Sequence, residues 1–187
     1  MIALREVKRL RRHVRLKRIL VIGTGGSGKS TVARRLAQRT GLPLIHLDAH
    51  YWRPGWQPTP PDEWRAKVQQ LVKGHAWIID GNYGGTLDLR LEACDTVIFL
   101  DLPRAVCLWR VLRRRLRHLG KTRPELPRGC PERLSWEFLT WIWTYPSRRR
   151  GIIRERLAGL DQRKRVVILR SSGEVEEFLA RVPDAAA

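Results

Sequence analysis

The chain has 187 residues, enough for one compact domain and too few for two of ordinary size. Hydrophobic residues make up 43% of it, so a core can form and wholesale disorder is excluded. Lysine plus arginine number 37 against 18 aspartate plus glutamate, which gives a formal net charge of +19. This charge favours anionic partners, namely phosphorylated ligands, nucleic acid or an acidic membrane surface, although an arginine-rich solvated surface has the same composition.

The cysteine pattern and the hydropathy bear on the cellular compartment in which the protein works. Cys94, Cys107 and Cys130 are odd in number and form no CxxC pair, so a reducing compartment fits better than a disulfide scaffold or a paired-cysteine metal site. No apolar run approaches the roughly 20 residues that span a bilayer, and the N-terminal segment lacks the apolar stretch of a signal peptide. We therefore predict a cytoplasmic protein with no membrane span, and we make no prediction of its oligomeric state.

The N-terminal segment forms a separate basic zone, so we divide the chain into an arm, residues 1–17, and a domain, residues 18–187. Between Arg5 and Arg18 there are eight cations and a single acid, Glu6. Such an arm could bind nucleic acid or a membrane surface through its charge. A floppy tail, or an extension upstream of the true start, accounts for the same pattern.

Strand and helix patterns alternate through the first half of the domain. Short apolar runs predict strands at 19–22, 44–47 and 77–79. Apolar spacing predicts a helix over 30–39, with Gly41 just beyond its end, and a second helix for which Thr59 offers the N-cap. The proline-rich segment 53–61 predicts a loop.

The alternation continues in the second half. We expect strands at 96–100 and 165–169, a long helix opened by Pro103, a helix near 134–145 stopped by Pro146, and a closing helix over 174–182. Residues 120–131 hold three prolines and two glycines, which predicts a loop of a length typical of lids and binding loops. Five apolar strands separated by helices predict a parallel sheet covered on both faces, that is, a three-layer α/β domain.

A phosphate-binding motif lies between the first strand and the first helix. It matches GxxxxGK[ST] and comprises, with one further residue, Gly23, Thr24, Gly25, Gly26, Ser27, Gly28, Lys29, Ser30 and Thr31. Glycines let the backbone turn its N–H groups inward around an anion, and the helix N-terminus adds its dipole. Lys29 would reach the β- and γ-phosphates and the Ser30 hydroxyl would ligate Mg²⁺. The motif therefore predicts ATP, or another purine nucleoside triphosphate, together with Mg²⁺.

A carboxylate is also needed near the metal, and two strands end in one. Asp80 and Asp101 each follow an apolar strand, so both would emerge at the carboxyl edge of the sheet, where ligands of α/β domains bind. Aspartate at a strand end is as often a turn former. We favour Asp80 as the metal ligand because Gly81 permits close backbone approach, whereas Asp101 precedes Leu102-Pro103 and a helix.

Two groups of arginines flank the long loop. Arg110 and Arg114 are four residues apart and share one face of the helix that leads into it, and residues 148–150 are arginines just past the next helix. Phosphoryl transfer needs positive charge on the oxygens of the transition state, and arginine supplies it bidentately. We predict catalytic roles for Arg110 and Arg114, against the alternative that they are solvated surface charges.

These features resemble the nucleoside-monophosphate-kinase superfamily of P-loop proteins, which includes adenylate and shikimate kinases. Further motifs resemble the adenylate-kinase-like proteins labelled "DNA topology modulation protein", and the match spans roughly residues 18–182. The motifs are Leu47-Asp48 with Trp52-x-Pro54-Gly55-Trp56, Ile79-Asp80-Gly81-Asn82-Tyr83, Gly129-Cys130-Pro131-Glu132-Arg133 and Trp141-Ile142-Trp143.

The resemblance implies a five-stranded parallel sheet in the order 2-3-1-4-5, with a lid region at about 110–150. It places Asp80-Gly81 at the metal-linked Asp-Gly of adenylate kinases, Arg110 and Arg114 at the lid-entry arginines, and the arginines of 148–150 near a second pair. It also implies that Ser171-Ser172-Gly173 contacts adenine. Asn82-Tyr83 departs from the adenylate kinase pattern, which weakens the case for an AMP acceptor.

The acceptor side would be built by residues 48–56. Asp48 could accept a proton from an acceptor hydroxyl, and its charge suits a non-phosphorylated acceptor better than a nucleoside monophosphate. His46, Asp48 and His50 alternate and could share a strand face as metal ligands, although short runs of this kind are usually structural. Trp52 and Trp56 could stack on a base or cap the core.

We expect a phosphotransferase that moves the γ-phosphoryl group of ATP–Mg²⁺ to a small acceptor: a nucleotide, a nucleoside or a hydroxylated metabolite. A nucleic-acid-associated ATPase or polynucleotide kinase that uses the basic arm is the alternative. A nucleotide-binding switch without turnover is the third hypothesis.

Overall fold

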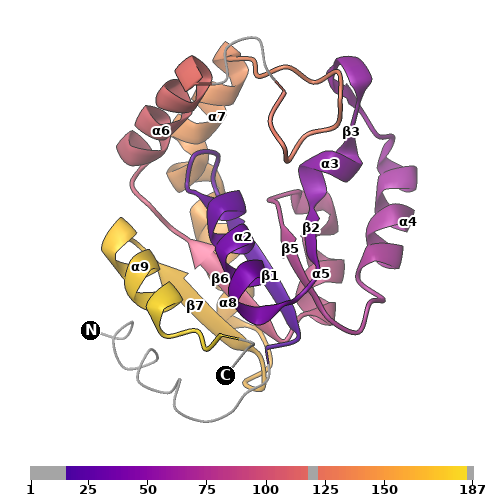
Figure 1. Cartoon of the computed structure of the whole chain (residues 1–187), viewed down its shortest axis with the longest axis vertical. Helices are drawn as coiled ribbons and strands as arrows, with labels where there is room; N and C mark the ends of the chain where they lie inside the picture. Colours follow the sequence, from indigo (N-terminus) through magenta and orange to yellow (C-terminus); the bar gives the residue numbers. More distant parts are fainter. Residues whose placement is uncertain (1–15, 118–121, 185–187) are drawn as a thin grey trace.

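The computed structural model describes residues 16–117 and 122–184 and places a parallel sheet between two layers of helices (Figure 1). The sheet has the strand order β2-β5-β1-β6-β7 and every pairing in it is parallel. Its strands are β1 (Arg18–Gly23), β2 (Leu44–His46), β5 (Trp77–Asp80), β6 (Thr96–Leu100) and β7 (Arg165–Leu169). Counted among themselves, these strands run in the order 2-3-1-4-5, which confirms the expected three-layer fold.

Helices cover both faces of the sheet. The α-helices are α2 (Lys29–Thr40), α3 (Leu47–Tyr51), α4 (Pro61–Leu71), α5 (Leu87–Ala93), α6 (Arg104–Arg117), α7 (Trp136–Tyr145), α8 (Gly151–Ala158) and α9 (Ser172–Ala180). Shorter turns are the 3-10 helices η2 (Pro54–Trp56) and η3 (Gly84–Thr86) and the π-helical η4 (Pro146–Arg150). No helix of the described residues is both long and apolar enough to cross a membrane.

The central strand β1 contributes side chains to the core on both faces of the sheet. Ile19 and Val21 point into one core, with residues of α2, α6 and α9, while Leu20 and Ile22 point into the other, with residues of α4, α5 and α8. All four side chains are fully buried, as expected for a strand whose alternate residues face opposite covered sides. Fully burying such an aliphatic side chain contributes about 1.5–3 kcal/mol, so this strand anchors the domain.

Two segments around strand β2 differ from the prediction. The strand ends at His46, and Leu47 begins the short helix α3, so Asp48 lies in the first turn of a helix instead of on a strand. The proline-rich loop contains a small antiparallel hairpin of β3 (Trp52–Arg53) and β4 (Gln57–Pro58). The Thr59 hydroxyl closes this hairpin by donating to the Tyr51 carbonyl at 2.6 Å.

Helix ends show where local signals succeed and fail. Gly41 ends α2 as predicted, with φ 69° and its N–H bonded to the Ala37 carbonyl. The N-cap of α4 is Pro60, and the prediction that Thr59 takes this role was wrong because its hydroxyl is used in the hairpin. We predicted that Pro146 stops the helix, and this prediction was wrong. Its φ of −61° suits a helix, and it opens the π-helical turn η4, which runs on into α8.

Candidate active site

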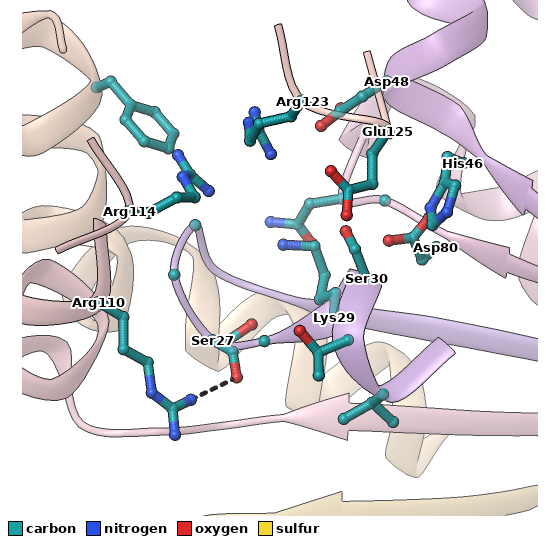
Figure 2. A pocket seen from close by; sticks show the side chains of 18 of the residues that line it. Ser27, Lys29, Ser30, His46, Asp48, Asp80, Arg110, Arg114, Arg123 and Glu125 are labelled. Atoms are coloured by element: carbon teal, nitrogen blue, oxygen red, sulfur yellow. Dashed lines mark hydrogen bonds and ion pairs between the residues drawn. The ribbon is translucent and has the colours of Figure 1, made fainter. Parts of the chain in front are cut away.

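A cavity of about 1230 Å³ opens at the carboxyl edge of the sheet. The loop after β1 lies on its floor, α6 and α7 form one wall, and the ends of β2 and β5 form the opposite wall. Residues 122–135, which we call the lid loop, pass over the top from α7 towards β3 (Figure 1). Figure 2 shows polar side chains from these separate elements pointing into one space.

The loop after β1 has the geometry of a phosphate cradle. Gly26 and Gly28 have φ of 77° and 97°, in the left-handed region that favours glycine. A Cβ on Gly26 would lie 2.1 Å from the Cys107 carbonyl oxygen, so only glycine fits there. The N-terminus of α2 has neither a side-chain cap nor an acidic residue in its first turn. Its N–H groups are therefore available to an anion.

Every residue of the predicted phosphate-binding set lies at this cradle. Residues 25–31 line the cavity, while Gly23 and Thr24 are buried beneath them. The Lys29 ammonium donates to the Thr24 carbonyl at 2.9 Å. Burial lowers the pKa of Lys29, and the charges of Asp48 and Asp80 oppose that shift. The Lys29 charge is thus held by main chain and by nearby carboxylates at the centre of the site.

Asp80, at the end of β5, faces the same space as Ser30 (Figure 2). One carboxylate oxygen is 2.6 Å from Nδ1 of His46, its partner on the neighbouring strand β2. Desolvation opposes charge on His46, but the bond to Asp80 and the Asp80 charge outweigh it and raise the pKa of His46. The second Asp80 oxygen and the Ser30 hydroxyl are hard oxygen donors of the kind that Mg²⁺ prefers, so the residues fit the predicted metal.

Asp101, the other candidate carboxylate, is engaged elsewhere. It is buried at the end of β6 and forms ion pairs with Arg150 at 2.7 Å and Arg154 at 2.6 Å. These bonds attach η4 and α8 to the sheet edge. Of the three arginines at 148–150, only Arg149 lines the cavity.

Asp48 lies across the cavity from the cradle. The Tyr83 hydroxyl donates to one Asp48 oxygen at 2.5 Å. Burial, followed by the charge and hydrogen bond of Asp48, raises the pKa of Tyr83, so the phenol keeps its proton and remains a donor. One Asp48 oxygen is thereby oriented by protein, while the carboxylate as a whole still lines the cavity.

The predicted arginine pair on α6 makes two different sets of contacts. Arg110 donates to the Ser27 carbonyl at 3.1 Å and to the Ser172 hydroxyl at 2.9 Å, so it connects the cradle to the start of α9. Arg114 pairs with the buried carboxylate of Glu132, which also pairs with Arg123 of the lid loop. Burial lowers the pKa of Arg114. The α6 pair thus fastens both the cradle and the lid loop.

Buried Arg90 holds the segment after β5. Its guanidinium donates to the carbonyls of Gly81 at 2.9 Å, Thr86 at 3.2 Å and Tyr83. Burial lowers the pKa of Arg90 to about 10, and no carboxylate forms a salt bridge with it in the described chain. Because these carbonyls fix the backbone around Tyr83, Arg90 sets the position of the phenol that reaches Asp48.

Short contacts join the lid loop to the hairpin, and we call them the lid seam. The Gly55 amide donates to the Gly129 carbonyl at 2.9 Å, and the Trp56 indole N–H donates to the Pro131 carbonyl at 3.0 Å. The Cys130 thiol contacts the Arg53 carbonyl at 3.3 Å. Trp56 also lies 5.2 Å from Trp52 in an edge-to-face pair, and both rings line the cavity.

Some expectations about metals and site residues need correction. His46, Asp48 and His50 do not share a strand face, because the strand ends at His46. Nowhere in residues 16–117 or 122–184 do three or more His, Cys, Asp or Glu side chains form a metal-binding group. Sequence reasoning missed the pairing of His46 with Asp80 and the roles of Arg90 and Arg123. Of the residues in these contacts, Glu132 could have been noticed in the sequence, because it belongs to the Gly129–Arg133 motif.

The arm prediction falls mostly outside the described residues. Leu16 packs against the core, and the Lys17 amide donates to Asp95 at 3.1 Å, so these two residues lie against the domain. Residues 1–15 lie outside the described chain.

No protein-family model and no curated protein matches the chain. Solved structures do resemble it. A shikimate kinase from Acinetobacter baumannii in complex with shikimate is 20% identical, with a TM-score of 0.55 and 94% of each chain covered. Shikimate kinase from Bacteroides thetaiotaomicron is 18% identical, with a TM-score of 0.53, covering 89% of this chain and 96% of that one.

A third structure, a sugar kinase from Janibacter sp. HTCC2649, is 20% identical with a TM-score of 0.50 and covers 89% of this chain and 91% of that one. At such identities the likeness concerns the arrangement of the backbone. The parallel sheet with helices on both faces gives this chain the same fold as these three kinase structures.

Proposed function

We propose that the protein is an ATP-dependent phosphotransferase that moves the γ-phosphoryl group of ATP–Mg²⁺ to a hydroxyl of a small acceptor. One observation supports this most: a phosphate cradle and the oriented carboxylate of Asp48 line a single cavity. A nucleotide-binding switch needs a carboxylate for its metal, a role that Asp80 can take, but it does not need a second carboxylate that can accept a hydroxyl proton. Within this fold we place the chain with the adenylate-kinase-like proteins labelled "DNA topology modulation protein", on its sequence motifs.

The phosphate side of the proposed reaction is built by the cradle. The N–H groups of residues 25–31 and the Lys29 ammonium bind the phosphate oxygens. Ser30 and Asp80 would hold Mg²⁺, which would neutralise charge on the β- and γ-phosphates. Arg110 contacts the cradle, so its charge is available to the oxygens of the transition state. Ser172, which Arg110 also contacts, belongs to the segment we expect beside adenine.

The acceptor side is built by Asp48. Its free oxygen accepts the hydroxyl proton while the acceptor oxygen forms a bond to the γ-phosphorus and the bond from that phosphorus to the β–γ bridging oxygen breaks. ADP and a phosphorylated acceptor are the products. An uncharged hydroxylated acceptor suits this side, because a phosphate group would be repelled by Asp48.

The first experiment measures ADP release from ATP–Mg²⁺ with a panel of acceptors: nucleoside monophosphates, nucleosides, small hydroxylated metabolites, and single- and double-stranded DNA. We expect one small hydroxylated compound to stimulate release. Asp48→Asn should reduce the stimulated rate at least about 100-fold while leaving ATP binding unchanged. Asp62→Asn, an exposed carboxyl on α4, is the matched control.

Other results would contradict the proposal. Stimulation by DNA alone would identify the nucleic-acid-associated ATPase or polynucleotide kinase instead. ATP binding without stimulation by any member of the panel would indicate a nucleotide switch. We further propose that the protein works in a reducing, cytoplasmic setting, which suits its three free cysteines.

A further inference from the structure

The outer side of α6, away from the cavity, is apolar and open to solvent. Val106, Trp109, Leu112 and Leu116 recur at helical spacing along it and are all exposed, with Trp109 65% and Leu116 78% accessible. Buried Cys107 and Val111 occupy the opposite side of the same helix. Helix α6 packs on the core through its buried side, so the exposed residues of its outer side do not contribute to the packing of this domain.

Helix α7 extends this surface. It lies beside α6 at one end of the molecule (Figure 1). Trp136 and Trp143 are one heptad apart on α7, and they are 80% and 50% exposed. The Arg104 guanidinium of α6 lies 3.9 Å from the centre of the Trp143 ring, so the two helices meet at this surface. We call the exposed residues of the pair the outer face: Val106, Trp109, Leu112, Leu116, Trp136 and Trp143.

The outer face is bordered by cations that have no acidic partners. Helix α6 contains no acidic residue. Arg104, Arg113 and Arg117 form no ion pair in the described part of the chain, whereas Arg114 of the same helix is paired with Glu132. Arg113 and Arg117 are exposed and border both this face and the cavity, which they also line. The surface therefore combines three tryptophans and three aliphatic side chains with uncompensated positive charge.

We propose that the outer face of α6 and α7 binds the surface of an anionic lipid bilayer. Tryptophan prefers the boundary between headgroups and acyl chains, leucine and valine gain by entering the acyl region, and arginine is attracted to anionic headgroups. All three requirements are met on one helix stripe and its neighbour. A cationic, apolar helix face lying in the plane of a membrane is the arrangement that these residues fit.

Two other occupants fit less well. A second copy of this chain would bring the same unpaired arginines together across a symmetric interface, and their repulsion opposes that pairing. Single-stranded nucleic acid would stack on free aromatic faces, but Arg104 covers the Trp143 ring, and Val106, Leu112 and Leu116 offer no stacking surface. Aliphatic exposure together with cationic charge favours the bilayer.

The apolar side chains of the outer face and the cavity lie on different sides of α6. Arg110 and Arg114 project from α6 towards the cavity (Figure 2), while Trp109 and Leu116 project outward. The six residues of the outer face do not line the cavity, whereas Arg113 and Arg117, which border that face, line it as well. The inference is independent of the proposed reaction.

The experiment is co-sedimentation of the full-length protein with vesicles of phosphatidylcholine alone or with about 30 mol% phosphatidylglycerol. We expect binding only to the anionic vesicles. Trp109→Ser with Leu116→Ser should lower the partition coefficient at least about tenfold, and Arg113→Gln with Arg117→Gln should lower it about tenfold and flatten its salt dependence. Arg163→Gln with Arg181→Gln, which removes equal charge elsewhere, should bind normally.

A second full-length variant tests the basic arm, with Lys8, Arg9, Arg11 and Arg12 changed to glutamine. Retained binding by this variant, with loss in Trp109→Ser/Leu116→Ser, supports the proposal. Loss in the arm variant with normal binding by Trp109→Ser/Leu116→Ser overturns it. The proposal is also overturned if the outer-face change abolishes binding of oligo-dT, or dissociates a dimer in sedimentation velocity, without affecting vesicle binding. Circular dichroism verifies that each variant is folded.

Discussion

Burial makes the positive charge of Lys29 less favourable than it is in water. Lys29 is desolvated, its pKa is lowered, and in this structure its ammonium donates to the Thr24 carbonyl. Phosphate oxygens are stronger partners for an ammonium than a main-chain carbonyl. The site therefore holds Lys29 in a position where a triphosphate improves its environment.

We expect Lys29→Met to lower ATP-dependent turnover at least about 100-fold, because a charge aimed at the transferred phosphoryl group is removed. Steady-state ADP release measures this change, and titration calorimetry with ATP separates binding from catalysis. Lys73→Met, an exposed lysine after α4, is the control. Near-normal turnover in Lys29→Met would show that the cradle is not the nucleotide site.

Tyr83 tests whether the orientation of Asp48 matters. Tyr83→Phe removes only the hydroxyl that donates to the carboxylate at 2.5 Å. Hydrogen bonds to charged groups contribute about 1.5–3 kcal/mol, so kcat with the acceptor should fall about tenfold or more while ATP affinity stays the same. Tyr51→Phe, in the same aromatic cluster, is the comparison. Equal kcat values for the two variants would mean that Asp48 needs no such support.

At the scale of elements, Arg90 connects helix α5 to the segment between β5 and η3. Arg90→Met removes the guanidinium donor from three carbonyls, of which that of Tyr83 still accepts from the Thr86 N–H. We expect the free energy of unfolding to fall by about 2–4 kcal/mol. Arg90→Lys should lose less, since an ammonium can satisfy some of these carbonyls. Urea denaturation measures both, with Arg65→Met on the exposed face of α4 as control. Equal stability of Arg90→Met and Arg65→Met would contradict this account.

The elements that sequence patterns predicted are those determined locally. A short run of apolar residues such as Ile19–Ile22 favours the centre of a covered sheet, and a glycine such as Gly41 ends a helix by its own conformational freedom. Pro146 misled because its fixed φ is compatible with both a stop and a new turn. Only the wider packing of α7 and α8 decides between them.

The part of the candidate site that was predicted from the sequence is the part that is determined locally. The cradle is contiguous in sequence, so its residues were found together. The His46–Asp80 pair depends on the register between β2 and β5, and the Glu132 bonds to Arg114 and Arg123 depend on how the lid loop returns to α6. Neither the register nor the return of the loop is encoded in spacing along the chain.

For the whole molecule, nucleotide binding should appear as added stability. A ligand at 100 times its Kd stabilises the folded state by about 2.7 kcal/mol, which for a domain of this size corresponds to a rise in Tm of about 5–10 °C. Thermal unfolding with ATP–Mg²⁺ measures the rise. Chelation of Mg²⁺, or the change Asp80→Asn, should reduce the rise. Asp101→Asn, which removes the ion pairs to η4 and α8, should instead lower the Tm of the protein without nucleotide. An unchanged rise in Asp80→Asn would remove Asp80 from the metal site.

Under the proposed reaction, the lid seam would limit the rate of turnover. The proposed acceptor, if it enters between the lid loop and the hairpin, would have to break the Gly55–Gly129 and Trp56–Pro131 bonds, and the product would have to break them again. The frequency of this opening then sets a ceiling on turnover, however rapid the phosphoryl step is. Such a protein would slow as solvent viscosity rises. Gly129, with φ 84° and Pro54 3.1 Å from the place of a Cβ, is the residue where one added methyl group would loosen the seam and remove that dependence.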